Sequence, residues 1–161
     1  MSKIIKVRNI TIGRGRPKIC GLVVAESAEG ILDMIEMVNS ASCDMFELRI
    51  DFFKECNETE KVKSLLRKVK RAAKKPMIFT LRTQAEGGNI SVSEKYYKEL
   101  LLMVAENSLA DLIDVEAMGL DVDTEGLIRD IRGRGTPVIA SVHYCNDMPG
   151  RKERKEAIRF L

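Results

Sequence analysis

Residues 45–82, MFELRIDFFKECNETEKVKSLLRKVKRAAKKPMIFTLR, decide the fold of this chain. The stretch begins with an apolar run from Met45 to Phe53 and ends with another from Met77 to Arg82. Between them, apolar residues recur every three or four positions among lysines and arginines, which predicts an amphipathic helix over 57–74. A strand, a helix and a second strand in this order predict a βαβ unit with two parallel strands.

The same alternation continues on both sides of this stretch. Further strands are predicted at 19–24, 112–117 and 138–143, and further helices at 27–38, 93–107, 124–132 and 151–161. The repeat is about 30 residues long, as expected for βα units. The chain is therefore predicted to be an α/β protein with about five βα units and a parallel sheet.

Two architectures of the α/β class fit this pattern, an open doubly wound sheet and a (β/α)8 TIM-type barrel. A complete barrel needs eight units and ~250 residues, so the 161 residues of this chain would form an incomplete one. We expect a single partial barrel domain over 1–161. Residues 1–17 are expected to be a lead-in, in which 4–12 predict a strand or hairpin that covers one end of the sheet.

The composition excludes several classes of protein. Charged residues make up 32% of the chain with a formal net charge of +3, a balance that argues against a nucleic-acid or membrane surface. The four cysteines lack C-x-x-C spacing and His143 is not placed to complete a zinc site, so we expect reduced thiols and no metal. The N-terminus lacks the apolar core of a signal peptide, and no run approaches the ~18 apolar residues of a membrane span. We expect a cytoplasmic protein.

Ionisable residues follow or end four of the five predicted strands. They are Glu47, Arg49, Asp51, Arg82, Asp114, Glu116 and His143. Strands often turn polar where they end, but a charge is costly to bury alone, whereas opposite charges can satisfy one another. In parallel α/β folds the ligand site lies at the carboxyl ends of the strands. We therefore predict one polar site there, and its arginines favour an oxygen-rich, anionic substrate.

His143 is the single histidine of the chain and the best candidate for a general acid or base. A lone histidine near a strand end is often structural, but acidic residues surround this one in the predicted site. A carboxylate beside it would fix its tautomer and raise its basicity. Glu86 and Asp114 are the candidates for that carboxylate.

Several of these segments resemble the type I 3-dehydroquinate dehydratases. The motifs are Glu47 to Phe53 (ELRIDFF), Phe79 to Gly88 (FTLRTQAEGG), Leu112 to Glu116 (LIDVE) and Ser141 to Tyr144 (SVHY), in the family's order. The lead-in from Ile10 to Ile19 is also similar. The resemblance covers essentially the whole chain, and the Arg-x-x-x-Glu-Gly-Gly motif together with the fifth-strand histidine is its most specific part.

The resemblance implies a (β/α)8 barrel that converts 3-dehydroquinate to 3-dehydroshikimate and water in the shikimate pathway, without metal or organic cofactor. In the family, a lysine of the sixth strand forms an imine that acidifies the adjacent carbon. By resemblance His143 is the acid and base, and Glu86 orients it. Glu47, Arg49 and Arg82 would bind the substrate, with Asp51, Asp114 and Glu116 in support.

The resemblance also implies a site that these residues do not complete. No lysine stands at the end of a predicted strand, and the chain closes on apolar residues without a Gly or Pro stop signal. We expect a truncated chain that is inactive in isolation. Two alternatives remain open: a non-catalytic α/β protein that binds a polyhydroxy acid, and a half-barrel that forms a homodimer through its open sheet edge.

Overall fold

A five-stranded parallel sheet forms the centre of the computed structural model, which describes residues 4–118, 123–145 and 148–160. Its strands are β3 (Cys20–Val23), β4 (Met45–Arg49), β5 (Met77–Thr80), β6 (Leu112–Glu116) and β7 (Val138–Ser141). The helices that alternate with them are α1 (Ala28–Ser40), α2 (Thr59–Ala72), α3 (Glu94–Glu106) and α4 (Thr124–Gly133), with α5 (Arg151–Phe160) after β7. The predicted alternation of strands and helices is confirmed.

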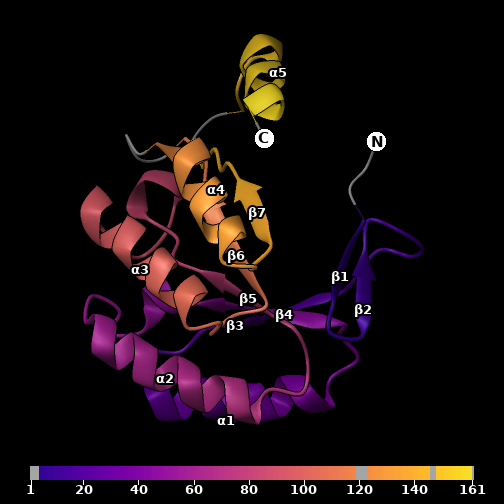
Figure 1. The fold of residues 1–161 in the computed structure, drawn as a ribbon, viewed down its shortest axis with the longest axis vertical. Helices are drawn as coiled ribbons and strands as arrows, with labels where there is room; N and C mark the ends of the chain where they lie inside the picture. The colour runs from indigo at the N-terminus through magenta and orange to yellow at the C-terminus, as the bar shows by residue number, and fades with distance from the viewer. Residues whose placement is uncertain (1–3, 119–122, 146–147, 161) are drawn as a thin grey trace.

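The strand order distinguishes the two architectures. Neighbouring strands in the sheet follow one another in the sequence, in the order β3-β4-β5-β6-β7. A doubly wound sheet reverses its order at a switch point, and the described strands contain no reversal. Helices α1 to α4 all contribute to one apolar core on the same face of the sheet, and in Figure 1 they follow the curve of the sheet on its outside. Both features are those of a barrel wall.

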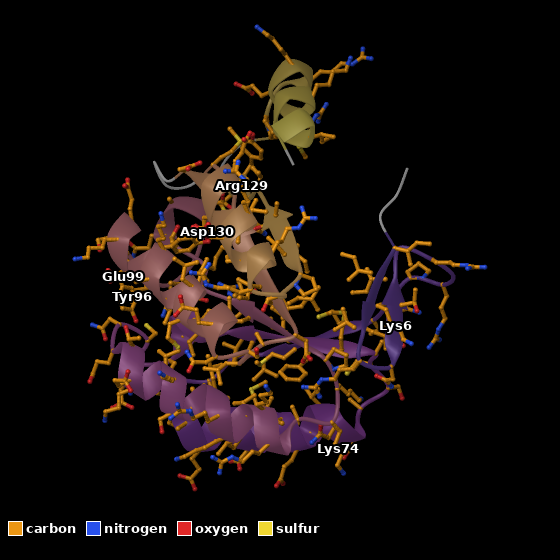
Figure 2. The ribbon with its side chains drawn as sticks, viewed as in Figure 1. Lys6, Lys74, Tyr96, Glu99, Arg129 and Asp130 are labelled. Carbon is orange, nitrogen blue, oxygen red and sulfur yellow. The ribbon has the colours of Figure 1, made fainter. Side chains whose placement is uncertain are left out.

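Local sequence explains where the helices begin. The hydroxyl of Ser27 accepts the backbone N–H of Gly30 at 3.1 Å and so caps α1, and Ser93 caps α3 in the same way. Each helix buries one apolar stripe, such as Ile31 and Ile35 in α1, which are both 0% exposed. Polar side chains such as Glu99 of α3 lie on the outer surface (Figure 2). No described helix is long and apolar enough to cross a membrane.

The first residues form an antiparallel hairpin of β1 (Ile5–Val7) and β2 (Ile10–Ile12). Val7 packs in a small apolar cluster with Met45 and Leu112, the first residues of β4 and β6. The hairpin therefore lies at the amino ends of the strands, and Figure 1 shows it beside that end of the sheet. The carboxyl ends of the strands lie at the opposite end of the sheet.

All five strands are shorter than predicted, β3 and β6 by only one residue at an end and the other three by more. The run to Phe53 forms β4 only as far as Arg49 and continues as a short 3-10 helix, η1 (Ile50–Phe52). Strands β5 and β7 end two residues before Arg82 and His143. These two side chains therefore lie on loops just beyond the sheet. Longer strands were predicted because the apolar pattern continues past the last backbone pairing.

Candidate active site

The site is built on the inner face of the sheet, defined here as the face turned away from the helices. The register places Leu22, Glu47, Arg49, Ile78, Thr80, Asp114, Glu116, Ile139 and Ser141 on it. Their sequence neighbours Phe46 and Leu48 are 0% exposed in the core beneath the helices. Because side chains alternate along a strand, the charged residues of β4 and β6 necessarily face inward.

Arg82 is the centre of a buried polar cluster. Its Nη2 donates to Asp114 Oδ1 at 2.9 Å, and its Nη1 donates to Glu116 Oε1 at 3.1 Å and to Glu86 Oε2 at 3.3 Å. Nη1 also donates to Ser141 Oγ at 3.0 Å. Arg82 is 4% exposed, and both of its terminal nitrogens donate to side chains of the site; its role in substrate binding stays a prediction. In this structure it orders the carboxylates from beneath the site.

Glu116 is fixed by its own loop as well as by Arg82. Its two carboxylate oxygens accept the backbone N–H of Thr83 at 2.8 Å and the hydroxyl of the same residue at 2.7 Å. Its backbone N–H donates to the buried hydroxyl of Tyr97 in α3. Glu116 is 3% exposed, so its role is to hold the end of β6 against the loop after β5.

Burial within the cluster disfavours the ionised form of Asp114. Its carboxylate accepts hydrogen bonds from Arg82 and from the hydroxyl of Ser141. Burial nevertheless raises the pKa of the Asp114 carboxyl above its ordinary value, and the contacts with Arg82 and Ser141 offset this only in part. One guanidinium faces three carboxylates, Glu86, Asp114 and Glu116, so the cluster has an excess of negative charge.

His143 meets Glu86 at the exposed edge of this cluster. Nδ1 of His143 lies 2.8 Å from Glu86 Oε2, and the same oxygen accepts the backbone N–H of His143 at 3.1 Å. Because an ionised carboxylate can only accept, a neutral imidazole in this contact has its proton on Nδ1 and a lone pair on Nε2. The side chain of His143 is 44% exposed. The imidazole is therefore partly open to solvent.

The loop that carries Glu86 explains the two glycines of the motif. Glu86 ends the short helix η2 (Gln84–Glu86), and Gly87 follows in the left-handed region at φ 78°. A Cβ atom on Gly88 would lie 2.0 Å from the carbonyl oxygen of Arg82. Only glycine permits this approach, so Gly88 allows the loop to pack directly against Arg82. Glu86 of the same loop is buried.

Arg49 and Glu47 form the accessible part of the inner face. Arg49 makes a two-pronged ion pair with Asp51, with both N–O distances at 2.8 Å, and Asp51 also accepts the backbone N–H of Asn89. Asp51 thus ties the end of β4 to the loop that carries Glu86. Glu47 is half-buried and makes no ion pair with any other residue that the structure describes.

The structure therefore groups the predicted residues in two sets. His143, Glu86, Arg82, Asp114 and Glu116 form one hydrogen-bonded network, and Arg49 with Asp51 forms a second one beside it. No described side chains form a group of three or more that could hold a metal ion. The five strands contain no lysine.

Sequence reasoning missed three contributors to the network. Ser141 shares a face with His143 by strand alternation, but nothing in the sequence shows that its hydroxyl reaches both Arg82 and Asp114. Thr83 stands beside Arg82 in the loop motif and gave no signal of its own. Tyr97 lies on the apolar face of α3, where an aromatic residue usually means packing alone.

Comparisons with known proteins agree with this geometry. Residues 19–160 match the family described as type I 3-dehydroquinase. A 3-dehydroquinate dehydratase of Clostridium botulinum is 36% identical over 154 residues, and one of Listeria monocytogenes is 32% identical over the same length. A solved type I 3-dehydroquinate dehydratase of Clostridium difficile, with covalently modified comenic acid, superposes with a TM-score of 0.89 at 32% identity.

These matches cover this chain more fully than they cover the relatives. The Clostridium botulinum protein matches 95% of this chain, but the match takes in 61% of its own length. A solved 3-dehydroquinate dehydratase of Enterococcus faecalis, with a TM-score of 0.89 at 30% identity, matches 97% of this chain and 65% of its own. Since the family match spans residues 19–160, well over half of the 161 residues, the chain belongs to the type I 3-dehydroquinase family.

Proposed function

We propose that this chain supplies the acid and base half of a type I 3-dehydroquinate dehydratase, which converts 3-dehydroquinate to 3-dehydroshikimate and water. The observation that carries the proposal is the 2.8 Å contact between Nδ1 of His143 and Glu86. It leaves Nε2 as an accessible base at the carboxyl ends of the strands, where α/β enzymes bind their substrates.

The proposed mechanism begins with proton transfer to His143. Nε2 takes a proton from the carbon beside the substrate carbonyl, and Glu86 stabilises the imidazolium that forms. The same proton then passes to the departing hydroxyl, so the ring returns to its starting state and one water is released. Arg49 and Glu47, on the accessible part of the inner face, would bind the carboxylate and hydroxyl groups of the substrate.

The lysine amine that forms the imine is proposed to come from a part of the whole protein outside this chain. The family's lysine forms an imine with the substrate ketone and acidifies the neighbouring carbon, and β3 to β7 contain no lysine. We propose that further βα units supply it and complete a (β/α)8 barrel. No metal or organic cofactor enters the proposal. The four free cysteines favour a reducing, cytoplasmic location.

Reconstitution tests this assignment. The part of the Clostridium botulinum dehydratase that this chain does not match is produced as a separate fragment and mixed with the chain and 3-dehydroquinate. Formation of the conjugated ketone is followed by ultraviolet absorbance. We expect each piece alone to be inactive and the mixture to be active. The His143→Ala variant should abolish the activity, whereas Ser64→Ala on the exposed face of α2 should leave it unchanged. Two pieces that bind each other but give no product would refute the proposal.

A second function is favoured by one observation, the absence of lysine from the five strands together with the accessible side chains of Glu47 and Arg49. On this alternative the inner face binds a polyhydroxy acid without converting it. Calorimetric binding of quinate to the chain alone, unaffected by His143→Ala and lost in Arg49→Ala, would support it over the dehydratase.

A further inference from the structure

Ser141 lies where the sheet meets the catalytic loop. It is the last residue of β7, its backbone carbonyl accepts the N–H of Ala117 at 2.8 Å, and it is paired with Glu116 in the register. Its hydroxyl donates to Asp114 Oδ1 at 2.8 Å. Because that hydrogen is used, the lone pairs of Oγ are left for Arg82 Nη1 at 3.0 Å.

Nη1 of Arg82 has more acceptors than hydrogens. It carries two hydrogens and lies within hydrogen-bond distance of three oxygens, from Ser141, Glu116 and Glu86. The contact with Ser141 is the shortest, at 3.0 Å, and the contact with Glu86 is the longest, at 3.3 Å. The serine hydroxyl therefore competes directly with Glu86 for this nitrogen.

Several donors also share one oxygen of the Glu86 carboxylate. Glu86 Oε2 accepts from Arg82 Nη1, from the backbone of His143 and from His143 Nδ1. Its other oxygen, Oε1, is buried and has no partner among the described residues. The described hydrogen bonds of the Glu86 carboxylate thus all fall on one oxygen, and a closer approach by Arg82 would weaken the hydrogen bond between that oxygen and the imidazole.

We infer that Ser141 is a positioning residue for His143, acting through Arg82 and Glu86. This inference rests on the proposed function and deepens it. Ser141 holds Nη1 of Arg82 at the longer distance of 3.3 Å from Glu86, so that Oε2 of Glu86 still accepts the Nδ1 proton. Without the hydroxyl, Nη1 moves to Glu86, the ring loses its acceptor, and the Nε2–H tautomer gains population. That tautomer has no lone pair on Nε2 and is inactive as a base.

The single histidine of the chain makes the test direct. Nitrogen-15 NMR at alkaline pH, where the imidazole is neutral, gives the ratio of the Nδ1–H to the Nε2–H tautomer without assignment or substrate. We expect Nδ1–H to predominate in the unmodified chain. In Ser141→Ala the ratio should fall about twofold to tenfold, which corresponds to the loss of one net hydrogen bond.

Two controls separate the hydroxyl from the general effect of substitution. Ser141→Thr keeps the hydroxyl and should keep the ratio, and so should Ser64→Ala, which removes an exposed hydroxyl from α2. Where Ser141→Ala does not fold, Ser141→Cys replaces it, because a thiol is a weak acceptor and should give the same fall.

The outcomes are distinguishable from failure of the proposed function. An unchanged ratio in Ser141→Ala, or an equal fall in Ser141→Thr, overturns the inference while the Glu86–His143 contact and the proposed function stand. If Nε2–H predominates in the unmodified chain, the contact itself is wrong, and the proposed function loses its main support together with the inference.

Discussion

At the scale of single residues, Arg82 is the cation shared by the three buried carboxylates of the site. Arg82 is buried against Glu86, Asp114 and Glu116, and a buried charge is tolerated only where an opposite charge and hydrogen bonds satisfy it. Its planar fork reaches acceptors from two strands and the catalytic loop at once, which an ammonium group cannot do. Arg82 thus contacts Glu86, the carboxylate that meets His143, and its role in substrate binding stays a prediction.

Replacing Arg82 should destabilise the fold, because the buried carboxylates depend on its positive charge. We expect Arg82→Met to lower the free energy of unfolding by about 3–5 kcal/mol, because it leaves buried carboxylates without a cation. Arg82→Lys keeps the charge and should lose less. Urea denaturation at neutral pH measures both. A loss below about 1 kcal/mol in Arg82→Met would show that the carboxylates are satisfied by other groups.

Asp114 should make stability depend on pH. Burial raises its pKa in the folded protein, so folding favours its protonated form. The stability that this contributes is complete below the ordinary pKa of 3.8 and is lost as pH rises through the higher pKa of the folded state. Asp114→Asn removes the titrating group, so its stability relative to the unmodified chain should increase across that window. Urea midpoints from pH 3 to 8 measure this, and a constant difference between the two proteins would speak against it.

The sequence identified the charged members of the site but not their arrangement. Glu86 and His143 are recognisable by motif, and strand alternation places Asp114 and Glu116 on one face. The network that joins them depends on a hydroxyl of Ser141, a loop amide of Thr83 and a buried phenol of Tyr97. Each of these depends on a tertiary distance, which local residue patterns do not encode.

At the scale of secondary-structure elements, the boundaries were the weakest part of the prediction. Ile50 and Phe53 are both buried, so the apolar run continues beyond β4, although the backbone has already turned into η1. Residue hydrophobicity reports burial and not backbone pairing. Helix starts were better predicted, because Ser27 and Ser93 cap their helices by a local hydrogen bond.

The backbone amides of β7 should be less protected from hydrogen exchange than those of β4 and β5. Among the described strands it pairs only with β6, whereas β4 and β5 each have two neighbours. Its residues are all partly exposed. We expect backbone amides of β4 and β5 to exchange with deuterium at least about tenfold more slowly than those of β7. Equal protection in the three strands would mean that something covers β7 in solution.

At the scale of the whole molecule, the five strands form a wall whose inner face carries the candidate site, and no other described strand pairs with either edge of the sheet. The strand order is sequential, and helices α1 to α4 lie on one side of the sheet (Figure 1). Edge strands β3 and β7 therefore present backbone groups to solvent. Leu22 on the inner face of β3 is 52% exposed, which is unusual for a strand residue in an α/β protein.

These open edges predict self-association of the isolated chain. We expect sedimentation equilibrium at micromolar concentration to give a mass above the 18.1 kDa of one chain. Leu22→Glu should lower it, because charges on an edge strand oppose pairing. Met37→Glu, at an exposed site on α1, serves as the control and should leave the mass unchanged. A chain that remains at 18.1 kDa throughout would show that its edges are protected within one molecule.

We have proposed that this chain provides the base and that further βα units of the whole protein provide the amine. Borohydride trapping with 3-dehydroquinate, followed by intact-mass measurement, tests it most directly, because reduction fixes an imine on the chain that bears the lysine. In the mixture with the Clostridium botulinum fragment, we predict one substrate-sized adduct on that fragment and none on this chain, alone or mixed. A stoichiometric adduct on this chain would contradict the account, since one of its own lysines would then reach the site.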